Sequence, residues 1–220
     1  MPILAARVGQ CVSLGQGVPS FPTPPHIVEA VYKALKDDPA SGKYSLQTGL
    51  PELRWKIAET LHAEKGIDAE PESEILVTVG AMEGLMATIL TLVDRGDEVI
   101  LPSPTYASFI EQVHLAEGVP VFVPLKSENW GLDMEKLRQA VTSKTRVVVL
   151  CNPGNPTGAV FADDSVRALC ELALGNQFVI ISDETYDYMT YDVPTPLSPA
   201  SLPEFKENVV SVFLFRKSMP

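Results

Sequence analysis

The chain has 220 residues and a formal net charge of −11, and 45% of its residues are hydrophobic. This length and composition fit one globular α/β domain or a large part of one. So acidic a chain lacks the lysine and arginine surplus that binding to nucleic acid or an anionic membrane requires. No basic and then apolar leader opens the sequence, and the longest apolar run, near 85–93, is too short to span a bilayer. We therefore expect a cytoplasmic protein with no nucleic-acid or membrane partner.

Cysteine and histidine residues are few and scattered. Cys11, Cys151 and Cys170 include no CxxC pair, and the three histidines are equally dispersed. We therefore expect no metal site.

Helices and strands alternate along the chain. The first predicted helix covers 24–35 with Thr23 as its N-cap, and the second covers 51–65 and ends at Gly66. The predicted strands are 75–79, 98–101, 119–123, 146–150, 178–182 and 208–213. The helices predicted between them are 81–93, 106–116, 134–141 and 164–174.

Several of these strands, such as VVVL and FVII, are continuously apolar. Such runs are typical of strands that helices cover on both faces. Strand and helix in alternation predict a three-layer α/β/α fold around a mainly parallel sheet. In open α/β sheets ligands bind beyond the carboxyl ends of the strands, so the residues that follow each strand are the candidates for function.

Two of these strand ends suggest contacts to a flat, phosphorylated ligand. The segment GAMEG follows 75–79 and enters a helix, where backbone amides at the positive end of the helix dipole can bind phosphate. PSPTY follows 98–101, and Tyr106 either stacks on a heterocycle or packs at the edge of the core.

The third strand end is the loop NPGNPTG, which follows 146–150. The side-chain amide of Asn155 lies between two prolines and would be fixed in direction, as orienting a ligand oxygen requires. The Asn155–Pro156 bond is a candidate for the cis form. A plain turn also uses these residue types, although rarely seven in a row.

The fourth strand end is DETY, where Asp183 follows 178–182. A carboxylate there is costly unless it meets a cation or a metal, and a protonated ring nitrogen is one such cation. The competing interpretation is the magnesium-side strand of a P-loop nucleotide site. The only GK, Gly42–Lys43, is followed by Tyr44 and has Asp37 where the first glycine belongs, so that interpretation fails.

In their order and spacing, LGQGVPSFPTP, KYSLQTGLPELR, VTVGAMEG, PSPTYASF, NPGNPTG and SDETY resemble the class I/II aminotransferases, which are fold-type I pyridoxal-phosphate enzymes. The resemblance covers nearly the whole chain. It implies the large domain of a PLP-dependent transferase, truncated before the small domain. Residues 1–50 would be an N-terminal segment and helix of the small-domain or dimer-arm part, and 51–220 an incomplete cofactor-binding domain.

The resemblance also implies roles for individual residues. Asp183 would pair with the pyridinium nitrogen of pyridoxal 5'-phosphate, while Asn155 and Tyr186 would hydrogen-bond its ring hydroxyl. Asn155 would also lie near the substrate, and Gly17 near the substrate carboxylate. The implied cofactor-binding set is Ala81, Met82, Tyr106, Asn155, Asp183, Tyr186, Lys217 and Tyr44.

Within this set, the amides of Ala81 and Met82 would bind the phosphate and Tyr106 would stack on the ring. Tyr44 would reach the cofactor phosphate of a neighbouring subunit, which implies a homodimer with shared sites. The alternatives for Gly17 and Tyr44 are a turn glycine and a core tyrosine.

The lysine that holds the cofactor covalently and moves the substrate proton would be Lys217. Its surroundings depart from the family, since Leu214 replaces a small or hydroxylated residue and Arg216 precedes the lysine. The phosphate-binding and substrate-binding arginines expected further along are absent. We therefore expect either an amino-terminal fragment or truncated isoform of such an enzyme, or a chain whose last few residues are foreign. In both cases we expect little or no transaminase activity from the 220-residue chain alone.

The function predicted is transfer of an amino group from an amino acid to a 2-oxo acid, with catalytic residues Lys217, Asp183 and Tyr186. One alternative is a PLP-dependent lyase or 1-aminocyclopropane-carboxylate-synthase-like enzyme on the same fold. An alternative of another class is an inactive truncated isoform that acts as a dimerisation or binding module.

Overall fold

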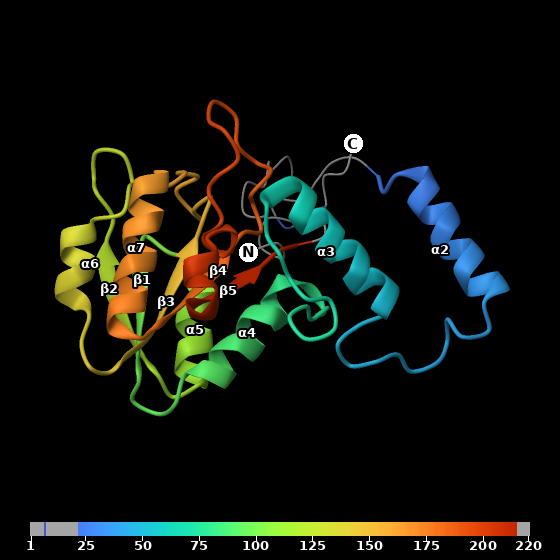
Figure 1. Ribbon diagram of the computed structural model, residues 1–220, viewed down its shortest axis with the longest axis horizontal. Coiled ribbons are helices and arrows are strands. Elements are labelled where there is room, and N and C mark those ends of the chain that lie inside the picture. Colours follow the sequence, from blue (N-terminus) through green and yellow to red (C-terminus); the bar gives the residue numbers. More distant parts are fainter. Residues whose placement is uncertain (1–6, 8–21, 215–220) are drawn as a thin grey trace. The chain divides into compact units, whose positions relative to one another are not determined.

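The computed structural model describes Arg7 and residues 22–214 (Figure 1). These residues fall into two compact units that separate between Tyr44 and Ser45. The first unit contains α2 (Pro25–Asp37), and the second spans Ser45–Leu214. The domain boundary near residue 50 stays a prediction from the sequence. No helix in the described ranges is long and apolar enough to cross a bilayer.

The second unit alternates helices and strands. Its helices are α3 (Pro51–Lys65), α4 (Gly80–Leu92), α5 (Ala107–Leu115), α6 (Met134–Ala140) and α7 (Asp163–Asn176). Its strands are β1 (Glu98–Ser103), β2 (Val119–Pro124), β3 (Thr145–Cys151), β4 (Val179–Asp183) and β5 (Val209–Val212). Two short 3-10 helices, η1 (Pro199–Ser201) and η2 (Pro203–Asn208), precede β5. The predicted helices and five of the six predicted strands lie within two residues of these bounds, and Gly66 ends α3 in the left-handed conformation.

Two local predictions were wrong. Residues 75–79 form no strand: Val77 donates its amide to the Thr48 carbonyl (3.0 Å), but the segment lies outside the sheet. This apolar run, rich in β-branched residues, has no partner strand among the described residues. Thr23 does not cap α2, whose N-cap is Pro24 and has no side-chain hydrogen bond.

All strand pairs of the five-stranded sheet are parallel, in the order β2-β1-β3-β4-β5. After β1 the chain adds β2 on one side of β1, and it then crosses over to add β3 on the opposite side of β1. Such a reversal of strand order marks the crevice where ligands bind in open α/β sheets. At the carboxyl ends, Cys151 of β3 pairs with Asp183 of β4, which pairs with Val212 of β5.

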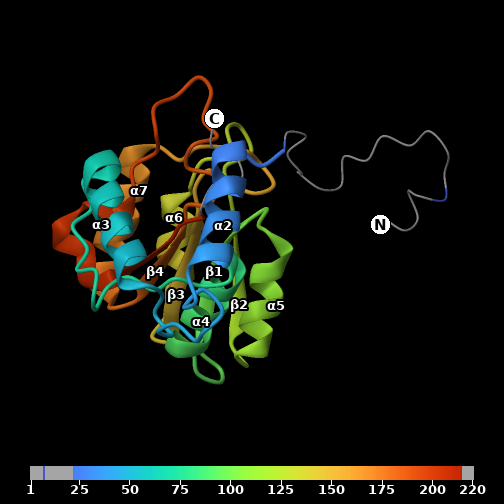
Figure 2. The ribbon, with the colours of Figure 1, turned by 90° about the vertical axis from the view of Figure 1, so that its right-hand side faces the viewer.

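Helices cover both faces of this sheet (Figures 1 and 2). On one face, Leu137 of α6 and Leu169 of α7 pack with Ile100, Val148 and Ile180 of the strands. The alternate strand residues pack on the other face with Leu85 and Ile89 of α4 and Phe109 of α5; these strand residues are Val99, Leu101, Val147, Val149 and Ile181. Because both faces of β1, β3 and β4 are buried, these strands are mostly apolar, and their polar residues lie mainly towards the strand ends.

Candidate functional site

The strand-order reversal between β1 and β3 brings three predicted residues to one edge of the sheet. Tyr106 follows β1 as the N-cap of α5, Asn155 lies in the loop after β3, and Asp183 is the last residue of β4. The Tyr186 hydroxyl belongs to the same group, because it accepts a hydrogen bond from Asn155, and its pKa is raised. Burial is the main cause that raises this pKa.

Asp183 is a buried carboxylate, 5% exposed. Its Oδ1 accepts hydrogen bonds from the amide (3.1 Å) and hydroxyl (2.6 Å) of Thr185. Among the described residues, no lysine, arginine or histidine lies within ion-pair distance of it. Burial raises the pKa of Asp183, although Thr185 and the Cys151 thiol act to lower it. A buried charge without a cation is costly, so this position suits a positively charged ligand group.

Asn155 and Tyr186 form the second element of the site. The Asn155 Nδ2 donates to the Tyr186 hydroxyl at 3.2 Å, across a sequence separation of 31 residues. Both side chains are half-buried. Their polar ends therefore converge on one point, where they can bind a single ligand oxygen from two directions.

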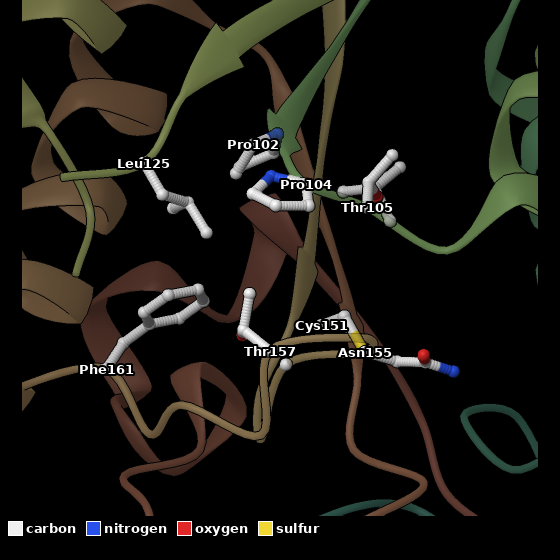
Figure 3. Close-up of a pocket in the computed structure, with 10 residues that line it drawn as sticks. Pro102, Pro104, Thr105, Leu125, Cys151, Asn155, Thr157 and Phe161 are labelled. Atoms are coloured by element: carbon white, nitrogen blue, oxygen red, sulfur yellow. The ribbon is translucent and has the colours of Figure 1, made fainter. Parts of the chain in front are cut away.

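The loop that carries Asn155 is closed by its own backbone. Gly154 donates to the Ala159 carbonyl (2.8 Å), and Gly158 donates to the Gly154 carbonyl (2.8 Å). The Asn155–Pro156 bond is cis as predicted, and the Asn152–Pro153 and Ser103–Pro104 bonds are also cis. A pocket lies between this loop and the end of β1, and the Asn155 side chain points away from its apolar walls, Leu125 and Phe161 (Figure 3).

Tyr106 lies on the β1 side of the crevice and is 37% exposed. The buried ring of Phe109 contacts it edge to face, with the centroids 5.7 Å apart and the planes at 85°. Such a contact holds an aromatic ring in a defined plane. Tyr106 is thus a partly exposed ring of fixed orientation beside the polar residues.

The N-terminus of α4 offers an anion-binding element. Gly80 starts the helix with φ +74°, and the N-cap Val79 provides no side-chain cap. The first turn of a helix lacks intrahelical acceptors for its amides, which leaves those of Ala81 and Met82 available. The Glu83 carboxylate reaches back to the Val79 amide and satisfies that donor.

The other three predicted site residues stay predictions. Gly17 and Lys217 lie outside the described residues. Tyr44 is the last residue of the first unit, so its contact with a cofactor stays a prediction.

The sequence analysis missed two contributors. Thr185 donates hydrogen bonds from its amide and its hydroxyl to the Asp183 carboxylate. An aspartate side chain often accepts from the residue two positions further along, so the sequence position of Thr185 indicates this contact. Cys151 lies opposite Asp183 in the strand register, and burial raises the pKa of its thiol to about 12. Strand register, which the sequence does not state, was needed to find it.

Together these groups fit pyridoxal 5'-phosphate. The uncompensated Asp183 suits a protonated ring nitrogen, and the Asn155–Tyr186 pair suits a ring hydroxyl. The free amides of α4 suit a phosphate, and Tyr106 provides an aromatic face. Tyr106 follows β1, Asn155 follows β3, and Asp183 and Tyr186 lie at the end of β4, whereas the α4 amides follow a segment that lies outside the sheet.

Comparison with known proteins agrees with this chemistry. Residues 9–214 match the family described as aminotransferase class I and II. The aspartate aminotransferase of Geobacillus stearothermophilus is 39% identical over 211 residues, which are 95% of this chain and 53% of that protein. The solved structure of N-succinyldiaminopimelate aminotransferase from Mycobacterium tuberculosis is 37% identical with a TM-score of 0.91, over 97% of this chain and 55% of that one.

The chain belongs to the class I and II aminotransferase family. It has the sheet and helices of the PLP-dependent transferase large domain. The aspartate aminotransferase of Pyrococcus abyssi is 37% identical over 216 residues, which are 98% of this chain and 55% of that protein. The chain therefore spans about half the length of the curated relatives it matches.

Proposed function

We propose that this chain binds pyridoxal 5'-phosphate and contributes to transfer of an amino group from an amino acid to a 2-oxo acid. The observation that carries the proposal is Asp183, a buried carboxylate with no cation among the described side chains, placed beside the Asn155–Tyr186 pair. When bound, the cofactor supplies an electron sink for carbanion chemistry at the substrate.

In this proposal each residue has one task. Asp183 keeps the ring nitrogen protonated, since an anion within hydrogen-bond distance favours the charged form. Asn155 and Tyr186 bind the ring hydroxyl and fix the rotation of the ring in its plane. Tyr106 stacks on the ring and excludes water from that face. The amides of Ala81 and Met82 bind the phosphate.

The proposal extends to residues that the site geometry does not include. Lys217 would hold the cofactor covalently and move the proton between substrate carbons. Gly17 would lie near the substrate carboxylate, and Tyr44 would reach the phosphate of a neighbouring subunit in a homodimer. The protein would act in the cytoplasm, on an amino acid and a 2-oxo acid.

The test starts with cofactor binding by the 220-residue chain. We expect added pyridoxal 5'-phosphate to give a new near-visible absorption band, and borohydride reduction followed by peptide mapping to place the adduct on Lys217. Absence of a binding signal with the wild-type chain would contradict the cofactor proposal. An adduct on another lysine, with the cofactor otherwise bound, would remove Lys217 from its assigned role.

Product analysis then tests the reaction. A transaminase releases a 2-oxo acid in equal amount with the new amino acid, whereas a lyase forms no new amino acid. Mixing the chain with an amino donor, a 2-oxo acid and the cofactor, and measuring both products, separates the two reactions. A 2-oxo acid formed without its amino acid partner would contradict amino transfer while leaving cofactor binding intact.

A further inference from the structure

A second buried carboxylate, Glu184, follows Asp183 directly in the sequence and is 3% exposed. It takes no part in the site described above. Side chains alternate in an extended backbone, so Glu184 shares a side with Ser182 while Asp183 points to the other. We refer to its surroundings as the Glu184 cluster: Lys65, Ser182, Glu184, Asp187, Ser198 and Ser211.

The Glu184 carboxylate is compensated by many groups. Its Oε1 accepts hydrogen bonds from the hydroxyls of Ser182 (3.0 Å), Ser198 (2.7 Å) and Ser211 (3.0 Å). Its Oε2 lies 3.6 Å from Lys65 Nζ. These partners belong to β4, to the N-cap of η1, to β5 and to the end of α3. One carboxylate thus joins four elements at the strand ends.

Lys65 connects the cluster to the segment after β4. Its buried Nζ lies 2.7 Å from Asp187 and packs over the rings of Tyr188 (5.7 Å to the centroid) and Phe213 (5.3 Å). Tyr188 in turn donates a hydrogen bond to Glu64 of α3. The residues that follow Asp183 are therefore attached to α3 through several contacts.

Packing the interior between α3, β4 and β5 does not require a charged cluster of this kind. Well-packed apolar side chains often stabilise a protein as much as a buried ion cluster of similar volume, because desolvating charges is costly. Burial indeed raises the pKa of Glu184, against the lowering effects of Ser198, Lys65, Ser211 and Ser182. What directional hydrogen bonds add is a defined orientation of the backbone that carries them.

That backbone also carries the cofactor-facing residues. The Asp183 carbonyl accepts from the Asn152 amide (3.0 Å), and the Glu184 amide donates to the Val212 carbonyl (2.9 Å). The peptide between the two carboxylates is therefore held from both sides. A rotation of this peptide unit would displace the backbone of both Asp183 and Glu184.

From these contacts we infer that Glu184 is a positioning residue: it fixes, from the side of the sheet opposite the cofactor, the direction in which Asp183 and Tyr186 point. This inference rests on the proposed function for its meaning, because it concerns the groups assigned to the ring nitrogen and ring hydroxyl. The positioning itself exists without cofactor and can be measured in its absence.

The first measurement uses the cofactor-free chain. Glu184→Gln keeps an acceptor for the serine hydroxyls but removes the charge that faces Lys65, and Ser211→Ala removes a single hydrogen bond. We expect amide hydrogen exchange of residues 183–188 to become at least about tenfold faster in Glu184→Gln, relative to β1, and less so in Ser211→Ala. The control Leu137→Ala truncates a fully buried side chain of α6 that is not in the cluster. It destabilises the chain without a selective change at 183–188.

The second measurement is affinity for pyridoxal 5'-phosphate, followed by absorbance or fluorescence. We expect binding at least about tenfold weaker in Glu184→Gln, a loss of about 1.4 kcal/mol, and unchanged in Leu137→Ala. Should Glu184→Gln fail to fold, Ser211→Ala and Ser198→Ala provide the same two readouts.

The outcomes separate the two proposals. Unchanged relative exchange and unchanged affinity in these variants would overturn the positioning role while the wild type still binds cofactor. A wild-type chain that binds no cofactor would contradict the proposed function, and the exchange measurement would then decide alone whether Glu184 orients the segment.

Discussion

Asp183 and Glu184 are consecutive carboxylates with almost equal burial and opposite surroundings. Among the described residues, Asp183 is hydrogen-bonded by Thr185 and the Cys151 thiol alone, whereas Glu184 has three hydroxyls and a lysine. A buried carboxylate whose partners are all within the chain organises the fold. A buried carboxylate that lacks a cation within the chain can be compensated by a positively charged group of a bound ligand. The comparison thus separates a residue that supports the site from one that uses it.

The largest expected effect is a loss of stability from a substitution in the Glu184 cluster. Lys65→Met removes the cation and leaves Glu184 and Asp187 as buried, uncompensated charges. Breaking a buried ion pair from one side costs about 3–5 kcal/mol, so we expect a loss of this size in the free energy of unfolding at neutral pH. Urea unfolding followed by circular dichroism measures it.

The sign of the pH dependence provides a second check on this variant. Burial raises the pKa of Glu184 and Lys65 acts to lower it, so without Lys65 Glu184 binds its proton still more tightly in the folded chain than in the unfolded one, and stability is regained as the pH falls. The matched control is Lys206→Met, because Lys206 pairs with Glu74 at 2.8 Å on the exposed surface. An effect of Lys65→Met no larger than that of Lys206→Met would contradict the account of the Glu184 cluster.

The next largest effect is on cofactor affinity and comes from a substitution of Asp183. In Asp183→Asn the group assigned to the ring nitrogen loses its charge, and we expect affinity for pyridoxal 5'-phosphate to fall about 100-fold. The cofactor-free variant should nevertheless be more stable than the wild type at neutral pH, by about 1 kcal/mol, because a buried charge without a cation is removed. Titration with the cofactor and urea unfolding measure the two quantities separately.

This stability gain depends on pH in a defined direction. The pKa of Asp183 is raised by burial, so the folded wild type binds a proton more tightly than the unfolded chain. Its free energy of unfolding therefore declines as the pH rises from the ordinary aspartate pKa of about 3.9 to the raised value, and then levels off. In Asp183→Asn this decline is absent. A variant that is less stable at every pH would show that Asp183 is structural.

Two asparagines of one loop extend the comparison to smaller effects. Asn155→Ala removes the hydrogen bond to Tyr186 from a half-buried position, so we expect about tenfold weaker cofactor binding and a stability change below about 1 kcal/mol. Asn152→Ala leaves the amide of Phe161 without its acceptor at 3.0 Å, in a buried place. Here we expect a stability loss of about 1–3 kcal/mol and little direct effect on binding. Equal effects of both variants on binding would contradict the role given to Asn155.

Much of this fold follows from the sequence alone. The apolar runs of β1, β3 and β4 are recognisable because parallel strands covered on both faces are apolar at every position. Residues 75–79 have the same composition without being a strand, because composition does not show whether a partner strand lies beside a segment. Pairing is a tertiary property, and local pattern predicted it wrongly here.

The residues around the candidate site also fall into those that the sequence predicts and those that only tertiary contacts reveal. Asp183, Asn155 and Tyr106 were predictable because parallel strands bring their carboxyl ends to one edge, so strand ends that are distant in sequence become neighbours. The Glu184 cluster was not predictable, since Ser198 and Ser211 lie 14 and 27 residues from Glu184 and Lys65 belongs to another helix. Serines in such positions carry no local signal of a shared acceptor.

The smallest expected effect concerns two thiols on different sides of the sheet, the half-buried Cys151 and the buried Cys170. Burial raises the pKa of Cys151 to about 12 and that of Cys170 to about 11, so both remain thiols near neutral pH and should alkylate far more slowly than in urea. Cys151 lies beside Asp183, whereas Cys170 lies in the core between α7 and the sheet. Added pyridoxal 5'-phosphate should therefore slow iodoacetamide labelling of Cys151 several-fold relative to Cys170, as peptide mass spectrometry would measure. General stabilisation of the fold by a ligand would slow both thiols equally, so an unchanged ratio would place the cofactor away from the end of β3.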